Sequence, residues 1–160
     1  MSVAPPPHII NLLLGAVPRQ ERDRVMAHCE LVELHFGKVL CEPDRPFRFL
    51  YFPVSGFISL VTTLGSHRPL ELALIGNEGM LGYGVMNSNQ NFNQATVRFP
   101  GFAYKLPIDI FQQELAQNSA FLQIWVAATR QMIFQIALPS ICSQRHTNEQ
   151  QIIRWILTTL

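Results

Sequence analysis

The chain has 160 residues and a formal net charge of +1, with 48% hydrophobic and 14% charged residues. This length suits one ordinary domain with a buried core, and the near-neutral charge excludes a whole-chain attraction to nucleic acid. The first residues lack the features of a secretion signal, and we expect no membrane span. The three cysteines, Cys29, Cys41 and Cys142, are far apart in the sequence. They indicate free thiols in the cytoplasm rather than a disulfide framework.

Residues 1–28 are predicted to form a tail followed by helices. The prolines at positions 5–7 favour an extended tail. A first helical face is indicated by the apolar residues Ile9, Ile10, Leu13 and Leu14. Pro18 lies where a helix can begin, because the amide hydrogen that proline lacks has no partner at that position. We therefore expect a second helix over Arg19–His28.

Residues 29–117 are predicted to form a β domain with one short helix. Apolar and polar residues alternate from Leu31 to Phe36, as a half-buried strand requires. Further strands are expected at Val39–Glu42, Phe49–Phe52, Phe57–Leu64, Leu70–Ile75, Gln94–Phe99 and Ala103–Leu106. Turn residues such as Pro53-Val-Ser-Gly and Pro100-Gly separate them. Short strands with glycine turns favour an antiparallel sandwich or jelly roll over parallel βαβ units. The short helix is expected over Asp109–Gln117.

Residues 118–146 are predicted to form one long helix, capped by Asn118 or Ser119. Bulky residues recur at three- and four-residue steps along it: Leu122, Trp125, Thr129, Met132, Ile133 and Ile136. This stripe is suited to pairing with a partner helix in a homodimer. The alternative is that the helix packs on its own sheet. Pro139 is expected to kink or stop the helix, because its ring clashes with the preceding turn.

Residues 147–160 are predicted to begin a further element. Thr147-Asn-Glu-Gln150 matches a capping box, with a hydroxyl at its first position and an amide three residues later. The helix that it opens contains Ile152, Ile153, Trp155, Ile156 and Leu157, and the sequence ends without a stop signal. We therefore expect the sequence to have been cut within a longer architecture, although a natural protein that ends here is the other possibility.

The ordered set of motifs resembles the sensor half of the Crp/Fnr family of bacterial transcription regulators. The motifs that carry the resemblance are Gly37-Lys-Val-Leu40, Glu42-Pro-Asp44, Tyr51-Phe-Pro-Val-Ser-Gly56, Gly76-x-x-Gly79-x-x-Gly82, Val97-Arg98 and the long helix after them. The resemblance implies a β jelly roll of the cyclic-nucleotide-binding type, followed by a dimerisation helix. It also implies that DNA is bound only by a helix-turn-helix domain, to which the segment from Arg145 to Trp155 resembles a lead-in.

The residues that hold a cyclic nucleotide in this family are replaced here. Family members that bind use a Gly-Glu pair for the ribose and an Arg-Ser/Thr-Ala run for the phosphate. Here Tyr83 follows Gly82, and Asn93-Gln94-Ala95 aligns with the phosphate-binding run. Losing the charge partner of a buried phosphate costs roughly 2–5 kcal/mol. Arg98 lies on the face opposite Asn93 in a regular strand, so it could supply the charge only through a bulge.

We therefore predict a domain that senses an unknown small-molecule effector, with Gly82, Tyr83, Asn93, Gln94 and Arg98 as the candidates for its pocket. Two alternatives remain: a cAMP-binding domain with a divergent cassette, and a ligand-free dimerisation scaffold whose pocket is filled by Tyr83 and Phe92. The sequence contains no His-x-His pair, nucleophile elbow or clustered thiolates, so no enzyme activity, metal or cofactor is expected. The effector, the target genes and the choice between activation and repression stay open.

Overall fold

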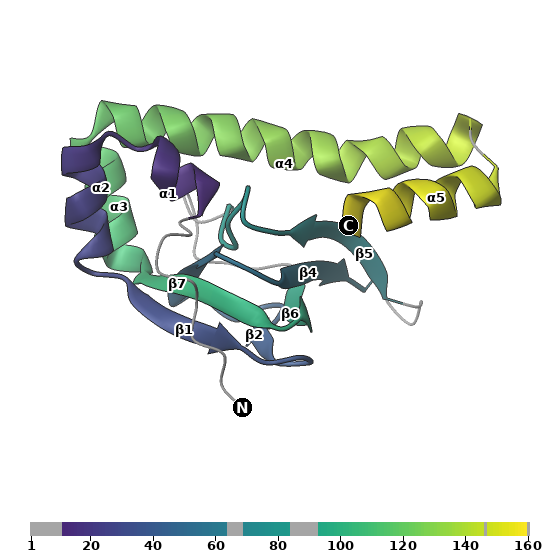
Figure 1. Cartoon of the computed structure of the whole chain (residues 1–160), viewed down its shortest axis with the longest axis horizontal. Coiled ribbons are helices and arrows are strands. Elements are labelled where there is room, and N and C mark those ends of the chain that lie inside the picture. Colours follow the sequence, from purple (N-terminus) through teal and green to yellow (C-terminus); the bar gives the residue numbers. More distant parts are fainter. Residues whose placement is uncertain (1–10, 64–68, 84–92, 146, 160) are drawn as a thin grey trace.

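The computed structural model describes residues 11–63, 69–83, 93–145 and 147–159. Within these ranges, two short helices precede the strands and three longer elements of helix follow them (Figure 1). In chain order the elements are α1 (Leu12–Ala16), α2 (Arg19–Met26), β1 (Glu30–Leu34), β2 (Val39–Cys41), β3 (Phe49–Pro53), β4 (Phe57–Thr62), β5 (Leu70–Ile75), β6 (Gln94–Phe99), β7 (Gly101–Pro107), α3 (Ile108–Gln117), α4 (Ser119–Arg145) and α5 (Asn148–Thr159).

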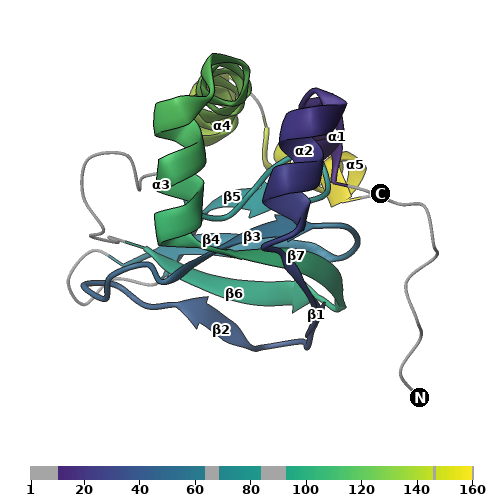
Figure 2. The ribbon, with the colours of Figure 1, turned by 90° about the vertical axis from the view of Figure 1, so that its left-hand side faces the viewer.

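The strands form two antiparallel sheets that lie one above the other. One sheet has the order β1-β7-β3 and the other the order β2-β6-β4-β5. Figure 2 shows α1, α2, α3 and α4 on one side of the strands, with β2 farthest from them. The helix α4 contacts β5 of the four-stranded sheet, and α3 contacts β7 of the other sheet. The predicted antiparallel jelly roll with a long helix after it is confirmed, and β5 and β6 begin and end at the expected residues.

The two faces of β3 contribute to two different layers of the core. Leu50 and Phe52 are buried, and Phe52 contacts an apolar layer that includes Phe111 of α3 and Trp125 of α4. Tyr51 points the other way, toward the opposite sheet, where Cys41 of β2 lies close enough to influence its titration. Because successive side chains of β3 point to opposite faces, Phe52 packs against the helices. Tyr51 points into the space between the two sheets.

Asn11 is completely buried and connects three parts of the chain. Its Oδ1 accepts hydrogen bonds from the backbone N–H groups of Leu13 and Leu14, which caps α1. Its Nδ2 donates to the carbonyl oxygens of Pro53 at 2.9 Å and Gly79 at 2.8 Å. The sequence analysis did not single out Asn11. An asparagine directly before a run of three leucines was the available signal for a capping residue.

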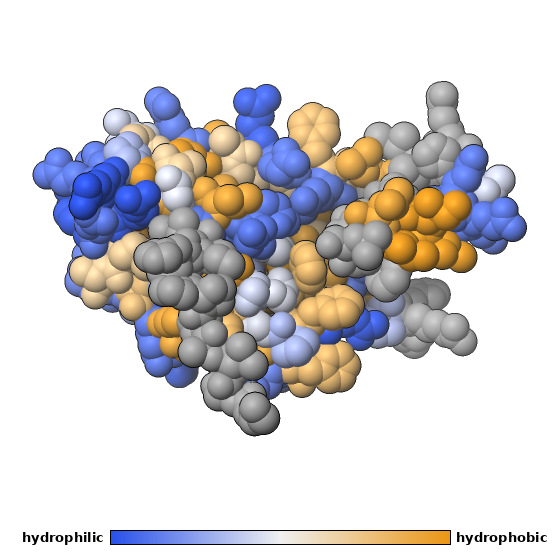
Figure 3. All heavy atoms as spheres, in the orientation of Figure 1, coloured by the Kyte–Doolittle hydropathy of each residue, from blue (hydrophilic) through white to orange (hydrophobic). Residues whose placement is uncertain are grey.

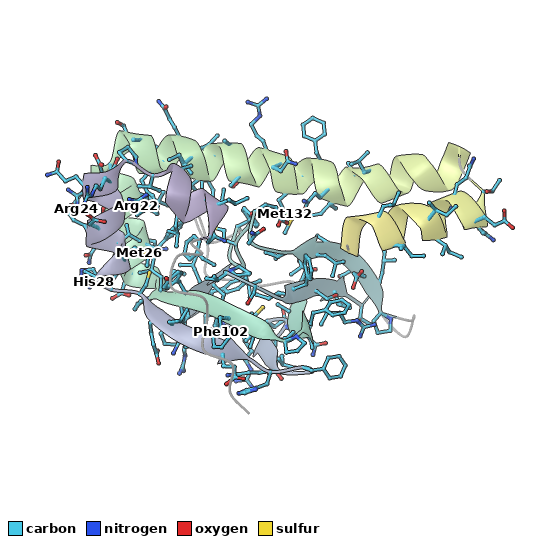
Figure 4. The ribbon with its side chains drawn as sticks, viewed as in Figure 1. Arg22, Arg24, Met26, His28, Phe102 and Met132 are labelled. Carbon is cyan, nitrogen blue, oxygen red and sulfur yellow. The ribbon has the colours of Figure 1, made fainter. Side chains whose placement is uncertain are left out.

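One face of α4 packs against its own domain. Asn118 caps the helix, since its Oδ1 accepts from the N–H groups of Ala120 and Phe121. The buried residues on the helix are Phe121, Trp125, Ala128 and Met132, and Figure 4 shows Met132 on the side of α4 that faces the roll. The segment Ser119–Leu138 is long enough to cross a membrane and has a mean hydropathy of 1.2, which the sequence analysis did not anticipate. Only 22% of that segment is buried inside the structure, so packing against the roll covers the smaller part of it.

Of the two outcomes expected at Pro139, a kink or a stop, the stop is wrong. The helix continues as one element to Arg145. A proline inside a helix removes one backbone hydrogen bond and crowds the preceding turn, at a cost of about 3 kcal/mol. The helix nevertheless extends on both sides of position 139.

The capping box at the start of α5 is confirmed. The N–H of Gln150 donates to Oγ1 of Thr147 at 3.3 Å, and the N–H of Thr147 donates to Oε1 of Gln150 at 3.1 Å. These reciprocal bonds satisfy two donors that a helix start otherwise leaves without partners. They lie at the point where the chain reverses direction after α4, so that α5 runs in the opposite direction to α4 (Figure 1).

Burial should make Cys29 unreactive in the folded protein. Desolvation raises the pKa of its thiol from 9.0 to about 12, and only the thiolate is an effective nucleophile. We expect alkylation of Cys29 by iodoacetamide near pH 8 to be at least ~100-fold slower in the folded than in the unfolded chain. Peptide mass spectrometry after timed labelling, with and without guanidinium, measures this ratio. Equal rates in the two states would contradict the burial of the thiol.

Candidate functional site

Gly82 occupies a position that only glycine fits. Its φ is +121°, and a Cβ there would lie 2.6 Å from Cδ2 of Leu50, a buried core residue. The preceding residue, Leu81, exchanges backbone hydrogen bonds with Tyr51 at 2.8 and 3.2 Å. The chain therefore passes close against β3 at Gly82, where a larger residue would clash with Leu50.

The side chain of Tyr83 folds back onto the segment that precedes it, Gly76–Gly82. Its hydroxyl oxygen accepts a hydrogen bond from the N–H of Met80 at 3.0 Å, and burial raises the pKa of the phenol to about 12. The side chain also borders a small space of about 10 Å³ beside Met132 and Gln135 of α4. A neutral aromatic group thus occupies the position where a ribose-binding carboxylate was sought, and it lies against the long helix.

Replacing Tyr83 by phenylalanine should destabilise the protein by about 1–3 kcal/mol, because the buried N–H of Met80 loses its acceptor. The difference should shrink as pH rises above 10. The folded chain holds the phenolic proton to about pH 12, whereas the unfolded chain releases it near 10.0, so wild-type stability falls in that interval. Urea unfolding of both proteins near pH 7 and near pH 11 measures the two differences. A constant difference across this range would contradict the burial of Tyr83.

Asn93, Gln94 and Arg98 are not brought together into one anion site by the described residues. The backbone carbonyl of Asn93 accepts a hydrogen bond from Sγ of Cys41 at 3.8 Å, and Gln94 begins β6 opposite Val61 of β4. A bulge does occur in β6, since Phe57 pairs with Phe99 and Ile58 with Val97, which leaves Arg98 as the extra residue. Arg98 is nevertheless exposed. Phe92 lies outside the described residues.

A much larger cavity than the small space beside Tyr83 lies elsewhere, between β2 of one sheet and β3 of the other. Its volume is about 300 Å³. It is lined by Val39, Leu40, Cys41, Glu42, Arg45, Pro46, Phe47, Arg48, Phe49 and Tyr51. A volume near 300 Å³ is at the lower end of the range for small-molecule sites. The connection between the two strands, residues 42–48, supplies both charged and aromatic lining.

The lining of this cavity combines positive charge with aromatic surface. Arg45 and Arg48 are exposed and flank the buried Phe47. Behind them, Nζ of Lys105 lies 4.2 Å from the centre of the Phe49 ring and 3.0 Å from a carboxylate oxygen of Glu30. Burial, with the nearby Cys41 and Glu30, raises the pKa of Tyr51, which therefore stays a neutral phenol. The arrangement can accept a small anion that has an apolar part.

Sequence reasoning missed this cavity because residues 42–46 were interpreted only as a turn. Asp44 has a φ of +58°, so the turn itself is present. The available signal was the Arg-Pro-Phe-Arg run at positions 45–48, in which two arginines bracket an aromatic residue next to a strand.

The six candidates for dimer contacts divide between the two sides of α4. Trp125 and Met132 are 8% and 6% exposed and pack against their own domain, whereas Ile133 is 61% exposed. The others, Leu122, Thr129 and Ile136, are partly buried. The exposed apolar face of the helix consists of Val126, Ile133, Phe134 and Leu138. A second exposed apolar group lies on α5, at Ile152, Ile153, Ile156 and Leu157, and Figure 3 shows apolar surface over that helix.

Comparison with known proteins identifies the class to which this fold belongs. No protein-family model matches the sequence, and no curated protein matches it. Solved structures do match, and they are Crp/Fnr-family transcription regulators and cyclic-nucleotide-binding domains. The resemblance noted from the sequence motifs is therefore confirmed at the level of the fold.

Three of the similar structures illustrate the match. The c-di-GMP-responsive global regulator CLP of Xanthomonas campestris has a TM-score of 0.70 and 17% identity, over 87% of this chain and 70% of that one. The catabolite activator protein of Thermus thermophilus has a TM-score of 0.66 and 15% identity, over 82% and 62%. A cyclic-nucleotide-binding domain from Methylobacillus flagellatus has a TM-score of 0.67 and 12% identity, over 87% and 84%.

Proposed function

We propose that this chain is the effector-sensing and dimerisation part of a cytoplasmic, bacterial transcription regulator of the Crp/Fnr type. The observation that carries the proposal is the shared arrangement of a jelly roll followed by one long helix, in a fold whose solved neighbours include regulators. Those neighbours are regulators rather than enzymes, which favours a role in sensing. The division into residues 1–28, 29–117, 118–146 and 147–160 is part of the same proposal.

The effector that we propose is not a cyclic nucleotide. Tyr83 replaces the ribose-binding glutamate and is packed against Met80, while Asn93 and Gln94 supply no positive charge. Arg98, the nearest replacement in the sequence, is exposed on β6. A phosphate diester that is removed from water needs a charged partner to offset its loss of hydration. The cavity between β2 and β3 favours a sensing domain over the ligand-free scaffold.

The homodimer that we propose forms along the exposed face of α4. Its central residues are Ile133 and Phe134, which are 61% and 64% exposed. Val126 lies seven residues before Ile133, and Leu138 lies four residues after Phe134, so each of these pairs lies on the same side of the helix. Pairing of two such helices would bury this apolar face, while Trp125 and Met132 hold each helix on its own roll.

DNA contact, in this proposal, belongs to a further domain to which α5 leads. The motif from Arg145 to Trp155 carries that expectation through its resemblance to the family. The apolar residues Ile152, Ile153, Ile156 and Leu157 are exposed on α5, and an apolar helix face of this kind is suited to packing on another folded unit. No DNA binding is expected of the described residues themselves.

Two measurements on the chain test this function. Sedimentation equilibrium should show a homodimer, and calorimetric titration with cAMP and cGMP should show no binding at micromolar concentrations. A monomer at all accessible concentrations would refute the dimerisation role. Micromolar affinity for either nucleotide would instead support the alternative of a cAMP-binding domain with a divergent cassette.

A further inference from the structure

Arg45 and Arg48 are candidates for ligand binding, because their side chains have no evident structural role in the fold. Both line the 300 Å³ cavity between β2 and β3, and neither takes part in an ion pair among the described residues. Neither side chain supports the core, because both are exposed. Only their backbones have structural partners: the N–H of Arg45 bonds the carbonyl of Glu42, and the carbonyl of Arg48 accepts from Ile108.

Phe47 explains how two exposed arginines can be held at one cavity. Its side chain is 8% exposed and belongs to the hydrophobic core. A buried anchor between two arginines fixes the backbone of the connection, so that both guanidinium groups lie at the rim of the same space. Guanidinium groups form paired hydrogen bonds with carboxylates and phosphates, and a site that is already ordered loses less entropy when it binds.

The inner wall of the cavity is suited to an apolar or aromatic body. Leu40, Phe49 and Tyr51 line it, and the hydroxyl of Tyr51 is the polar group at its inner end whose pKa burial raises. Lys105 lies over the Phe49 ring but is paired with Glu30, so its charge is already partly neutralised. The positive charge of the lining is therefore that of Arg45 and Arg48, and it exceeds the single negative charge of Glu42 in the same lining.

We propose that the cavity between β2 and β3 binds a small organic anion, a carboxylate or a phosphate monoester on an aromatic or apolar body, with Arg45 and Arg48 as its charge partners. The volume fits roughly one ring with a short acidic group. This deepens the proposed function, since it names the ligand class of the sensing domain. The anion site differs from the cassette at Gly82–Ala95, because its cations come from the connection between β2 and β3.

Matched pairs of probes test the proposal on the whole chain. Benzoate is compared with benzamide, and phenyl phosphate with phenol, so that each pair shares a ring and differs in the anionic group. Saturation-transfer NMR detects weak binding, and titration to about 10 mM probe covers the affinity range expected for such small molecules. We expect at least one anion to bind at least ~10-fold more tightly than its neutral partner, as a charge-assisted hydrogen bond implies.

Substitutions of the cavity arginines distinguish binding in the cavity from nonspecific binding of anions to the protein surface. Arg45→Gln and Arg48→Gln should each weaken the bound anion about 10-fold or more, while Arg19→Gln, on the exposed surface of α2, should change nothing. Because the two cavity arginines are exposed, their variants should melt at the wild-type temperature, which separates lost binding from lost folding. Equal binding of neutral and anionic probes, unchanged affinity in the Arg45→Gln Arg48→Gln double variant, or no binding by any anion would overturn the proposal.

The result of the anion-binding experiments can be distinguished from the result of the dimerisation test of the proposed function. A dimer that binds none of the anions would remain a candidate sensor for ligands of another class. A monomer that binds benzoate through Arg45 would contradict the dimerisation role and keep the anion site.

Discussion

Replacing Asn11 by alanine is expected to destabilise the protein by about 3–7 kcal/mol, enough to unfold a domain of marginal stability. The substitution removes the cap of α1 and leaves the carbonyls of Pro53 and Gly79 without their buried donor. A lost cap costs ~1 kcal/mol, and each unsatisfied buried group adds roughly 1–3 kcal/mol. Urea unfolding followed by circular dichroism measures the change.

Two further variants separate the two contributions of Asn11 to stability: the cap of α1 and the two long-range hydrogen bonds from Nδ2 to Pro53 and Gly79. Asn11→Ser keeps an oxygen that can cap α1 but has no Nδ2 group to reach Pro53 and Gly79, so it should lose only the bridging part. Asn77→Ala removes an exposed amide from the neighbouring segment and should shift stability by less than ~0.5 kcal/mol. If Asn11→Ser matched wild type, the two long-range hydrogen bonds would carry no net stability.

Replacing Ile133 by glutamate is expected to convert the proposed homodimer into monomers. Ile133 lies at the centre of the exposed face of α4 and is 61% exposed in the single chain. A two-fold interface contains the residue twice, and burying an isoleucine contributes about 1.5–3 kcal/mol. The dimer dissociation constant should therefore rise at least ~100-fold. Sedimentation velocity over a concentration series measures it.

A matched control distinguishes the interface from a general effect of added charge. Phe36→Glu introduces the same carboxylate at a residue that is 70% exposed in the turn after β1, and the dimer should be unaffected. Trp125→Glu is unsuitable for this purpose, because Trp125 is buried in its own domain and the variant would fail to fold. A dimer that survives Ile133→Glu would place the interface on another surface.

The β domain could be predicted because its signals are local. Alternation with a period of two and turn residues marked each strand, and β5 and β6 agree with their predicted bounds. The caps at Asn118 and Thr147 were also local, since each depends on residues at most three positions apart. One long helix was expected, but the possible stop at Pro139 does not occur, because the cost of one proline is weighed against a helix whose total stability a local pattern does not give.

The candidate site could be predicted only in part, because its geometry is long-range. The sequence indicated that Tyr83 breaks the nucleotide-binding pattern, and this stays the central observation. It did not indicate that Arg45 and Arg48 would border a cavity with Tyr51, since that depends on how two sheets face each other. The apolar stripe on α4 was visible, but periodicity alone does not say which side meets the roll. Trp125 and Met132 lie on that side.

Because α4 is one continuous helix, a tilt at one of its ends displaces the other end. Its 27 residues span about 40 Å at the usual rise of a helix, and its fully buried contacts, among the residues whose side chains are described, lie between Phe121 and Met132. The part of α4 beyond Met132 spans about 20 Å, so a tilt of about 5° about Met132 moves the far end of the helix by roughly 1.7 Å. A small change in the packing of Met132 is thus converted into a shift of about one third of a helical turn at the end of α4.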